Sequence, residues 1–171
     1  MAEDQQPDAS EGAGVTYDFR PVAHGDMILL ARWLREPVVA AWWRDPVRQL
    51  AEIQQDLANP QMEQVIVTAD GDPIAYAQVY EVHAFDAPHL AAQPQGALAI
   101  DCFAGPEGLG HGKAWLRELG DRLLSGAFVI VVDPEPGNMR AVAAYQGAGF
   151  TDRGMGNDAQ GNPARIMTRH R

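Results

Sequence analysis

A glycine-rich loop between two apolar segments constrains this chain more than any other feature. Residues 98–103 form an apolar run that is interrupted only by Asp101, which is typical of a buried strand. Four glycines then follow within eight residues, at positions 105, 108, 110 and 112. Next comes an amphipathic run with apolar side chains at helical spacing, from Trp115 to Leu124. This order predicts a strand, a loop and a helix whose first turn offers unpaired backbone N–H groups to a phosphate.

Two common phosphate-binding patterns do not fit this loop. The P-loop pattern requires Ser or Thr after Gly-Lys, but Gly112-Lys113 is followed by Ala114. The dinucleotide pattern Gly-x-Gly-x-x-Gly fails because Trp115 stands at the position of its third glycine. The remaining segment, residues 109–114, reads Leu-Gly-His-Gly-Lys-Ala. On its own this segment is equally compatible with a pyrophosphate site and with a glycine loop that only begins a helix.

A second motif follows the next apolar run. It has the pattern Asn-x-x-Ala-x-x-x-Tyr-x-x-x-Gly-Phe and consists of Asn138, Ala141, Tyr145, Gly149 and Phe150. In this order, the loop and the motif resemble those of the GNAT acetyltransferases, in which the loop pattern Gln/Arg-x-x-Gly-x-Gly/Ala holds coenzyme A. Leu109 departs from that pattern at its first position, which removes a side-chain contact but no backbone N–H. The resemblance covers residues 19–168.

The resemblance implies a fold, a cofactor and a mechanism. The fold is α/β (α+β), with one mixed, mostly antiparallel sheet of about six or seven strands. About four helices flank this sheet, which is splayed between strands 4 and 5. Acetyl-CoA is the implied co-substrate, without a metal, and Tyr145 is the implied general acid in a direct acetyl transfer. The implied cofactor contacts come from the strand, the loop and the second motif: Cys102, Phe103, Leu109, Gly110, His111, Gly112, Lys113, Ala114, Asn138, Ala141 and Tyr145.

Hydrophobic periodicity predicts the remaining elements. Strands are expected at residues 15–20, 64–68, 74–80, 128–132, 150–154 and 164–168, with a hairpin turn at 70–72. Helices are expected from a cap at Asp26 to Pro37, from Pro46 to Asn59-Pro60, and from Asn138 to about residue 147. The buried face of the second of these helices should carry Val47, Leu50, Ile53 and Leu57.

The composition fits one globular domain that follows an acidic tail. The chain has 171 residues, a net charge of −10 and a single cysteine, which is expected to be a small buried hydrophobe on its strand. Residues 1–14 carry four acidic side chains and are predicted to be disordered, whereas residues 15–171 form the acetyltransferase domain. No signal peptide or membrane span is visible, which predicts a cytoplasmic protein. The negative charge argues against nucleic acid as a partner and suits a cationic substrate.

Two adjacent tryptophans and a long loop are further candidates for function. Trp42 and Trp43 cannot both face the core from one helix, so we expect one in the core and the other along a cleft, or both beneath loops. The loop at residues 81–96 is long for a compact domain, and such loops are usually functional or mobile. Its histidines make no metal-binding pattern.

Several segments are also similar to the aminoglycoside 6′-N-acetyltransferases, whose substrates carry several ammonium groups. These segments are Arg20-Pro21, Trp33-Leu34, Trp42-Trp43, residues 75–80, Ile100-Asp101 and Asp133-Pro134. The similarity implies an acidic cleft in which Asp101 orients the amine or relays its proton. An aspartate in an apolar strand is costly to bury unless it is paired, which favours this role for Asp101 over a purely structural one. The implied substrate contacts are Trp42, Trp43, Tyr80, Asp86, Asp101 and Asp133.

The sequence therefore predicts an acetyl-CoA-dependent N-acetyltransferase that acts on a primary amine of a cationic small molecule, foremost the 6′-amine of aminoglycosides. Three alternatives stay open: a hydroxylysine N-acetyltransferase of siderophore biosynthesis, a protein or peptide N-acetyltransferase, and a non-catalytic domain that binds acyl-CoA. The siderophore enzymes carry a histidine on the strand before the glycine loop, and residues 98–103 contain none. We expect no nucleic-acid or membrane partner, and a monomer or a weak homodimer.

Overall fold

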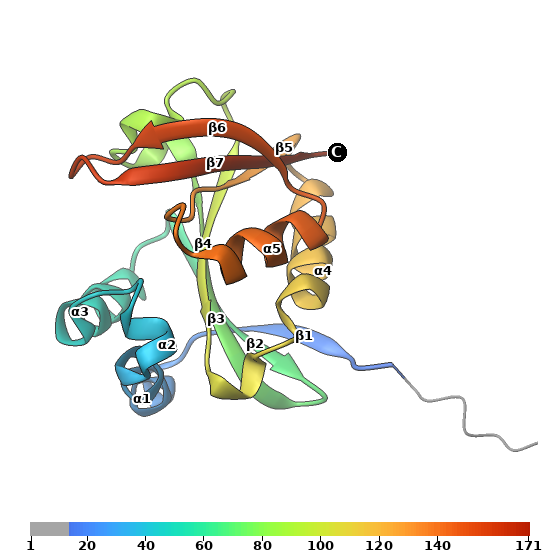
Figure 1. Ribbon diagram of the computed structural model, residues 1–171. Helices are drawn as coiled ribbons and strands as arrows, with labels where there is room; N and C mark the ends of the chain where they lie inside the picture. The colour runs from blue at the N-terminus through green and yellow to red at the C-terminus, as the bar shows by residue number, and fades with distance from the viewer. Residues whose placement is uncertain (1–13) are drawn as a thin grey trace, which may run out of the picture.

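The computed structural model describes residues 14–171, so the predicted acidic tail lies almost wholly outside the described residues. Within residues 14–171, seven strands form one sheet in the order β1-β2-β3-β4-β5-β7-β6 (Figure 1). The strands are β1 (Tyr17–Pro21), β2 (Met62–Ala69), β3 (Asp72–Glu81), β4 (Leu98–Ala104), β5 (Val129–Val132), β6 (Thr151–Asn157) and β7 (Pro163–His170). Only β4 and β5 run parallel to each other. The predicted mixed, mostly antiparallel sheet is therefore confirmed.

Helices cover both faces of the sheet. They are α1 (Met27–Arg35), α2 (Pro37–Ala40), α3 (Pro46–Asp56), α4 (Gly112–Leu124) and α5 (Met139–Gly147). The first three lie on one side of the sheet, and α4 and α5 lie on the other (Figure 1). Short 3-10 turns, η1 (His24–Asp26), η2 (Val82–Ala84), η3 (Pro88–Leu90) and η4 (Pro106–Gly108), occupy the connections.

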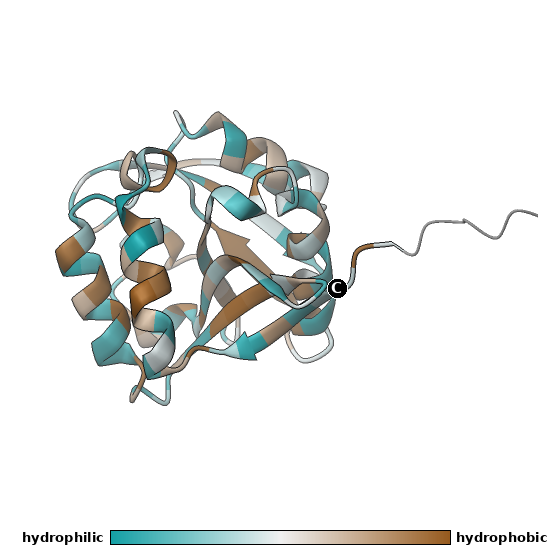
Figure 2. Ribbon diagram, turned by 90° about the horizontal axis from the view of Figure 1, so that it is seen from below, coloured by the Kyte–Doolittle hydropathy of each residue, from teal (hydrophilic) through white to brown (hydrophobic). Residues whose placement is uncertain are grey.

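The alternation of side chains along the central strands builds two apolar cores. In β2, Val65 and Val67 pack toward α4 and α5, whereas Ile66 packs in the cluster beneath α1 and α3. Successive side chains of a strand point to opposite faces, so a fully apolar strand supplies both cores. In Figure 2, brown segments predominate in the strands at the centre, while the outer helices alternate between brown and teal.

Some predicted details of the helices are wrong. Asp26 precedes α1, but its carboxylate does not cap the helix; it accepts hydrogen bonds from Arg20 and from the Ala23 amide instead. The first helix does end before Pro37, as predicted, but Pro37 also begins the short helix α2, which was not predicted. Val47 is 71% exposed, although Ile53 of the same helix is buried as expected. The first turn of α3 therefore projects beyond the sheet, and its periodic pattern overstates the buried face.

Two predicted backbone features are present. The turn between β2 and β3 has positive φ angles at Asp70 (49°) and Gly71 (90°), as the tight hairpin predicted here requires. Strands β4 and β5 pair only at Leu98 with Ile130 and at Ala99 with Val131, and then diverge. The predicted splay is therefore confirmed, and it opens a gap beside the second half of β4.

No helix of the described residues is long and apolar enough to cross a membrane.

Candidate active site

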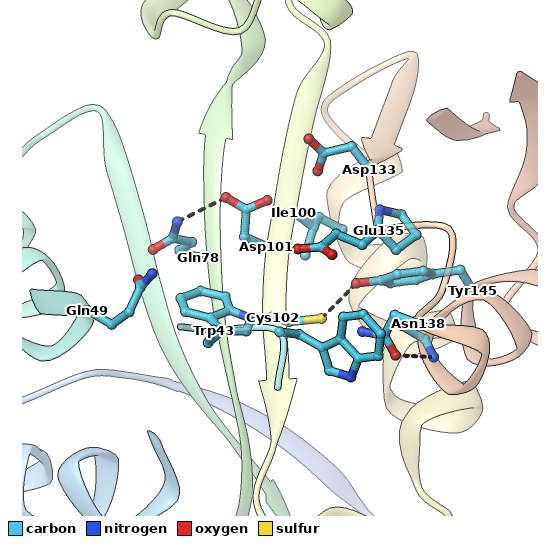
Figure 3. Close-up of a pocket in the computed structure, with 13 residues that line it drawn as sticks. Trp43, Gln49, Gln78, Ile100, Asp101, Cys102, Asp133, Glu135, Asn138 and Tyr145 are labelled. Carbon is cyan, nitrogen blue, oxygen red and sulfur yellow. Dashed lines mark hydrogen bonds between the residues drawn. The ribbon is translucent and has the colours of Figure 1, made fainter. Parts of the chain in front are cut away.

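The gap between β4 and β5 opens into a cleft with two adjoining cavities. The smaller, of about 300 Å³, is lined by Gln78, Asp101, Asp133 and Glu135. The larger, of about 630 Å³, runs along the glycine loop and between α4 and α5. The two cavities share six residues, namely Trp42, Trp43, Cys102, Asn138, Ala141 and Tyr145. The two cavities therefore meet at Cys102 and Tyr145. Figure 3 shows the residues that line the smaller one.

The glycine loop provides free donors at the start of α4. Among residues 14–171, the amides of Gly110, Gly112 and Lys113 have no hydrogen-bond partner. These N–H groups lie where the helix dipole contributes partial positive charge, so the donors present fit a pyrophosphate. Gly110 has φ of 90° and open space around it, which allows the loop to turn before the helix.

Two residues of the predicted loop are engaged elsewhere. The His111 ring lies with Nδ1 2.8 Å from the Tyr17 hydroxyl on β1, and it does not line either cavity. The Ala114 amide donates to the His111 carbonyl as part of the first helical turn. The pattern of the loop could not reveal this, because Tyr17 is far away in the sequence.

Asp101 is held by its cross-strand neighbour. Gln78 and Asp101 are register partners on β3 and β4, and Gln78 Nε2 donates to Asp101 Oδ2 at 3.0 Å. Burial and the nearby negative charge of Asp133 raise the pKa of Asp101 to about 7, although its interactions with Gln78 and Tyr80 oppose this shift. A carboxyl group with this pKa can accept a proton near neutral pH.

The Gln78 side chain belongs to a buried network of hydrogen bonds. The Tyr76 hydroxyl lies 2.9 Å from Gln78 Oε1 and 2.6 Å from Gln64 Oε1, and Gln64 Nε2 donates to the Ile53 carbonyl of α3. Tyr76 is fully buried, and burial is the main reason that its pKa lies far above the usual value. The Tyr76 hydroxyl carries one proton, which the two glutamine oxygens share, so the Asp101 carboxylate is what directs the Gln78 N–H toward itself.

Tyr145 reaches the junction of the two cavities from α5. Its hydroxyl lies 3.2 Å from Cys102 Sγ on β4 (Figure 3). Burial raises the pKa of Tyr145 well above its usual value, so the phenol keeps its proton at neutral pH. Burial also raises the pKa of Cys102 to about 12, which keeps the thiol neutral. Cys102 packs against the core as a partly buried residue and lines both cavities, so it is less buried than the sequence predicts.

Both tryptophans line the cleft, and neither is fully buried. Trp43 packs edge-on against Tyr76 and Phe103, which anchors it to the sheet. The ring of Trp42 lies over Gly137, where an added Cβ would sit 3.5 Å from Trp42 Cη2. The expectation of one core residue and one cleft residue is therefore only half right.

An ion pair joins the two walls of the cleft. Arg44, between α2 and α3, donates two hydrogen bonds to Glu135, at 2.5 and 3.0 Å. Glu135 follows β5 and lines the smaller cavity. Together with the contact between Trp42 and Gly137, this pair spans the cleft from one wall to the other.

The remaining predicted substrate residues lie at different distances from the cavity. Asp133 lines the smaller cavity and pairs with His89, with Nε2 and Oδ2 2.6 Å apart. Tyr80 faces Asp101 and packs against Phe85, but it does not line either cavity. Asp86 is exposed in the loop between β3 and β4 and also lies outside both cavities.

Comparison with known proteins identifies the family. A family model described as an acetyltransferase (GNAT) domain matches residues 23–157. The chain belongs to the GNAT acetyltransferases. The predicted family and the acetyl-CoA-dependent acetyltransferase activity are thereby confirmed.

Three relatives illustrate where this GNAT chain stands. The aminoglycoside N(6′)-acetyltransferase type 1 of Klebsiella pneumoniae is 30% identical over an alignment of 166 residues, and the match covers 90% of this chain and 82% of the relative. The structure of aminoglycoside acetyltransferase AAC(6′)-Ib with coenzyme A and kanamycin has a TM-score of 0.79 at 27% identity, and the match covers 91% of this chain and 95% of that one. A structure of AAC(6′)-Ib with paromomycin and acetyl-CoA has a TM-score of 0.78 at 27% identity, with coverage of 91% and 94%.

Within the GNAT fold, several residues of the site escaped the motifs. Gln78, Glu135, Arg44 and His89 contact or line the cleft, yet none stands in either motif. Of these residues, Gln78 alone could have been noticed in the sequence, because it is a polar residue within a mostly apolar central strand. His89 and Asp133 are 44 positions apart in the sequence, and Arg44 and Glu135 are 91 positions apart. No local sequence pattern spans such separations.

Proposed function

We propose that this GNAT enzyme transfers acetyl from acetyl-CoA to the 6′-amine of aminoglycosides. The observation that carries the proposal is the convergence of three carboxylates, Asp101, Asp133 and Glu135, on the smaller cavity next to Tyr145. A substrate with several ammonium groups fits such a set of acceptors, because charged donors can bind Asp101 and can share Asp133 with His89 and Glu135 with Arg44. The likeness to aminoglycoside N(6′)-acetyltransferases supports the same substrate class.

Asp101 acts as the general base in this proposal. An ammonium group must lose a proton before its nitrogen can attack a thioester carbonyl, and the carboxylate of Asp101 accepts that proton. Gln78 orients the carboxylate through its hydrogen bond, and Asp133 helps to keep the pKa of Asp101 raised toward neutrality. The carboxylates of Asp133 and Glu135 would bind other ammonium groups of the same substrate.

Tyr145 acts as the general acid. Acetyl-CoA, when bound, supplies the thioester carbonyl and the thiolate leaving group. The Tyr145 hydroxyl lies where the two cavities meet and is protonated at neutral pH, so it can donate a proton to that thiolate. Because the Cys102 thiol is also neutral, it is a poor nucleophile, which favours direct transfer over an acylated enzyme.

The cofactor half of the proposal rests on the glycine loop. The amides of Gly110, Gly112 and Lys113 would hold the pyrophosphate, and Leu109 and Asn138 line the cavity that leads from the loop to Tyr145. His111 would contribute through its backbone position alone, since its ring is engaged by Tyr17. The cytoplasmic location and the oligomeric state stay predictions.

The test is release of free thiol from acetyl-CoA with a panel of acceptors. The panel comprises kanamycin, paromomycin, which carries a 6′-hydroxyl, N6-hydroxylysine and a basic peptide. We expect turnover with kanamycin and little with paromomycin, because a hydroxyl is a much weaker nucleophile at neutral pH. Turnover with hydroxylysine alone, or with the peptide alone, would overturn the proposed substrate class. If none of the four acceptors led to release of free thiol although acetyl-CoA binds, the result would favour a non-catalytic domain.

A further inference from the structure

A histidine that no motif marks lies beside the acceptor half of the cleft. His89 Nε2 is 2.6 Å from Asp133 Oδ2, and the two side chains are only 5% and 22% exposed. The other ring nitrogen, Nδ1, is buried and has no hydrogen-bond partner among the described residues. The imidazole is therefore fixed at one end by a carboxylate of the cavity and has no acceptor at the other.

The position of His89 is built into the fold. It lies on η3, where Leu90 is buried in a cluster with Val82 of the same loop and Val131 of β5. Gly156 of β6 leaves room for it, because a Cβ at that position would lie 2.9 Å from His89 Cβ. The contact with Asp133 thus joins the loop after β3 to the end of β5, next to the cavity.

Opposing effects act on the charge of this imidazole. Three carboxylates face it: Asp133 after β5, Asp158 from the turn between β6 and β7, and Asp101 on β4. Its hydrogen bond to Asp133 is the largest effect that raises the pKa of His89, and burial opposes this. In the charged form of the ring, Nδ1 carries a buried N–H that has no acceptor, and an unpaired buried donor costs free energy. The charge therefore depends on how much negative charge the carboxylates keep.

We propose that His89 is a positioning and specificity-determining residue of the acceptor site, which fixes Asp133 and releases a proton when a cationic acceptor binds. The inference rests on the proposed function, because it needs an acceptor with ammonium groups. A bound ammonium would neutralise the carboxylates that favour the imidazolium. The ring then loses its Nδ1 proton to solvent, and the neutral ring keeps its Nε2–H directed at Asp133.

Proton release of this kind makes acceptor affinity depend on pH. Where His89 is charged in the free enzyme, each rise of one pH unit should lower the acceptor KM by up to about tenfold, the limit for one proton. Above that range the KM should be flat. In His89→Gln, the amide still donates to Asp133 but does not titrate, so the pH dependence of KM should shrink. The pH dependence of kcat, which follows Asp101, should persist.

The experiment is calorimetry of kanamycin binding to the full chain with coenzyme A present, at about pH 6, in buffers of different ionisation enthalpy. We expect the wild type to release up to one proton more per kanamycin than His89→Gln. The charge of His89 also lowers the pKa of Asp101, so the comparison is repeated in the Asp101→Asn background, where Asp101 releases no proton and the difference should persist. His83→Gln is the matched control, because His83 lies in the same loop, is exposed and, among residues 14–171, forms a hydrogen bond only with the Gln93 carbonyl. This control should release as much as the wild type.

A second measurement needs no variant. In NMR titrations of the five histidines, one ring should have a raised pKa that falls when kanamycin is saturating. Equal proton release in the wild type and His89→Gln, or no such ring, would overturn the role of His89, while kanamycin turnover would still support the proposed function. Wild-type protein that neither binds nor acetylates kanamycin would overturn both.

Discussion

The Asp101 carboxyl combines a fixed orientation with a pKa suited to proton transfer. Gln78 fixes one oxygen, and burial beside Asp133 raises the pKa. Asp101→Asn keeps the size of the side chain but cannot accept the proton of an ammonium group. We therefore expect kcat to fall by about 10²- to 10⁴-fold, with little change in the KM for acetyl-CoA. Steady-state kinetics with kanamycin would measure both.

Asp86→Asn is the matched control for this substitution. Asp86 was predicted to bind substrate, but it is exposed and outside both cavities. We expect kcat close to that of the wild type. A larger loss in Asp86→Asn than in Asp101→Asn would contradict the assignment of the base.

The raised pKa of Asp101 predicts a pH profile. The base works only when it is deprotonated, so kcat, which His89 does not control, should fall as the pH drops through the raised pKa of Asp101. Asp133→Asn removes a negative charge that helps to raise this pKa, so the fall should begin at a lower pH. Asp152→Asn, which removes a charge from β6 outside the cavities, should leave the profile unchanged. An unmoved profile in Asp133→Asn would show that the profile reports another group.

Tyr145→Phe tests the acid at the other side of the reaction. The substitution removes the hydroxyl that lies 3.2 Å from Cys102 Sγ and keeps the buried ring. We expect kcat to fall by about 10²-fold, the lower end for a general acid, because a thiolate is already a good leaving group. Cys102→Ala removes the neighbouring thiol and should cost less. Wild-type rates in Tyr145→Phe would exclude this hydroxyl as the proton donor.

At the level of secondary structure, the glycine loop shows what spacing alone can predict. The predicted order of strand, loop and helix is confirmed in β4, η4 and α4. The reason for Gly108 lies elsewhere: an added Cβ would lie 2.3 Å from the Ile74 carbonyl oxygen on β3. That oxygen also accepts a hydrogen bond from the Gly105 amide, so the loop is packed directly against a strand edge.

Gly108→Ala should therefore disturb both stability and cofactor binding. The clash is with backbone, which cannot rotate away, so we expect a loss of about 1–3 kcal/mol in the free energy of unfolding. The KM for acetyl-CoA should rise, because the loop must shift. Gly25→Ala is the control, since nothing lies within 4 Å of its Cβ position, and it should change stability by less than about 0.5 kcal/mol. Equal denaturation midpoints for the two variants would refute this account.

Local patterns located the elements because each element is encoded within a short window. The helix start at Asn138 is confirmed by its side chain, which accepts a hydrogen bond from the Ala141 amide. The exposure of Val47 and the hydrogen bond between Arg20 and Asp26 were not predictable from local patterns, because each depends on how an element packs against the rest of the protein. For the same reason the pairing of His89 with Asp133 was not predictable, because the two residues are 44 positions apart in the sequence.

For the molecule as a whole, the short pairing of β4 with β5 decides where the chemistry can occur. Only two residue pairs join these strands, and the cleft opens where pairing stops. Family resemblance implied a splay, but the residues of β4 do not reveal where it begins. The fold then brings carboxylates from β4 and from the segment after β5 to one cavity, in a chain with a net charge of −10.

This charge distribution predicts opposite salt effects for the two substrates. The Debye length shortens from about 30 Å at 0.01 M to about 8 Å at 0.15 M ionic strength. Screening should lower kcat/KM for cationic kanamycin, whose association the acidic cleft favours, and should not lower it for anionic acetyl-CoA. Arg44→Ala frees the carboxylate of Glu135 at the cleft and should steepen the response to kanamycin. Because Arg44 is exposed to solvent, the stability of the protein should change little. If both substrates responded alike to salt, the negative charge of the cleft would not guide the acceptor.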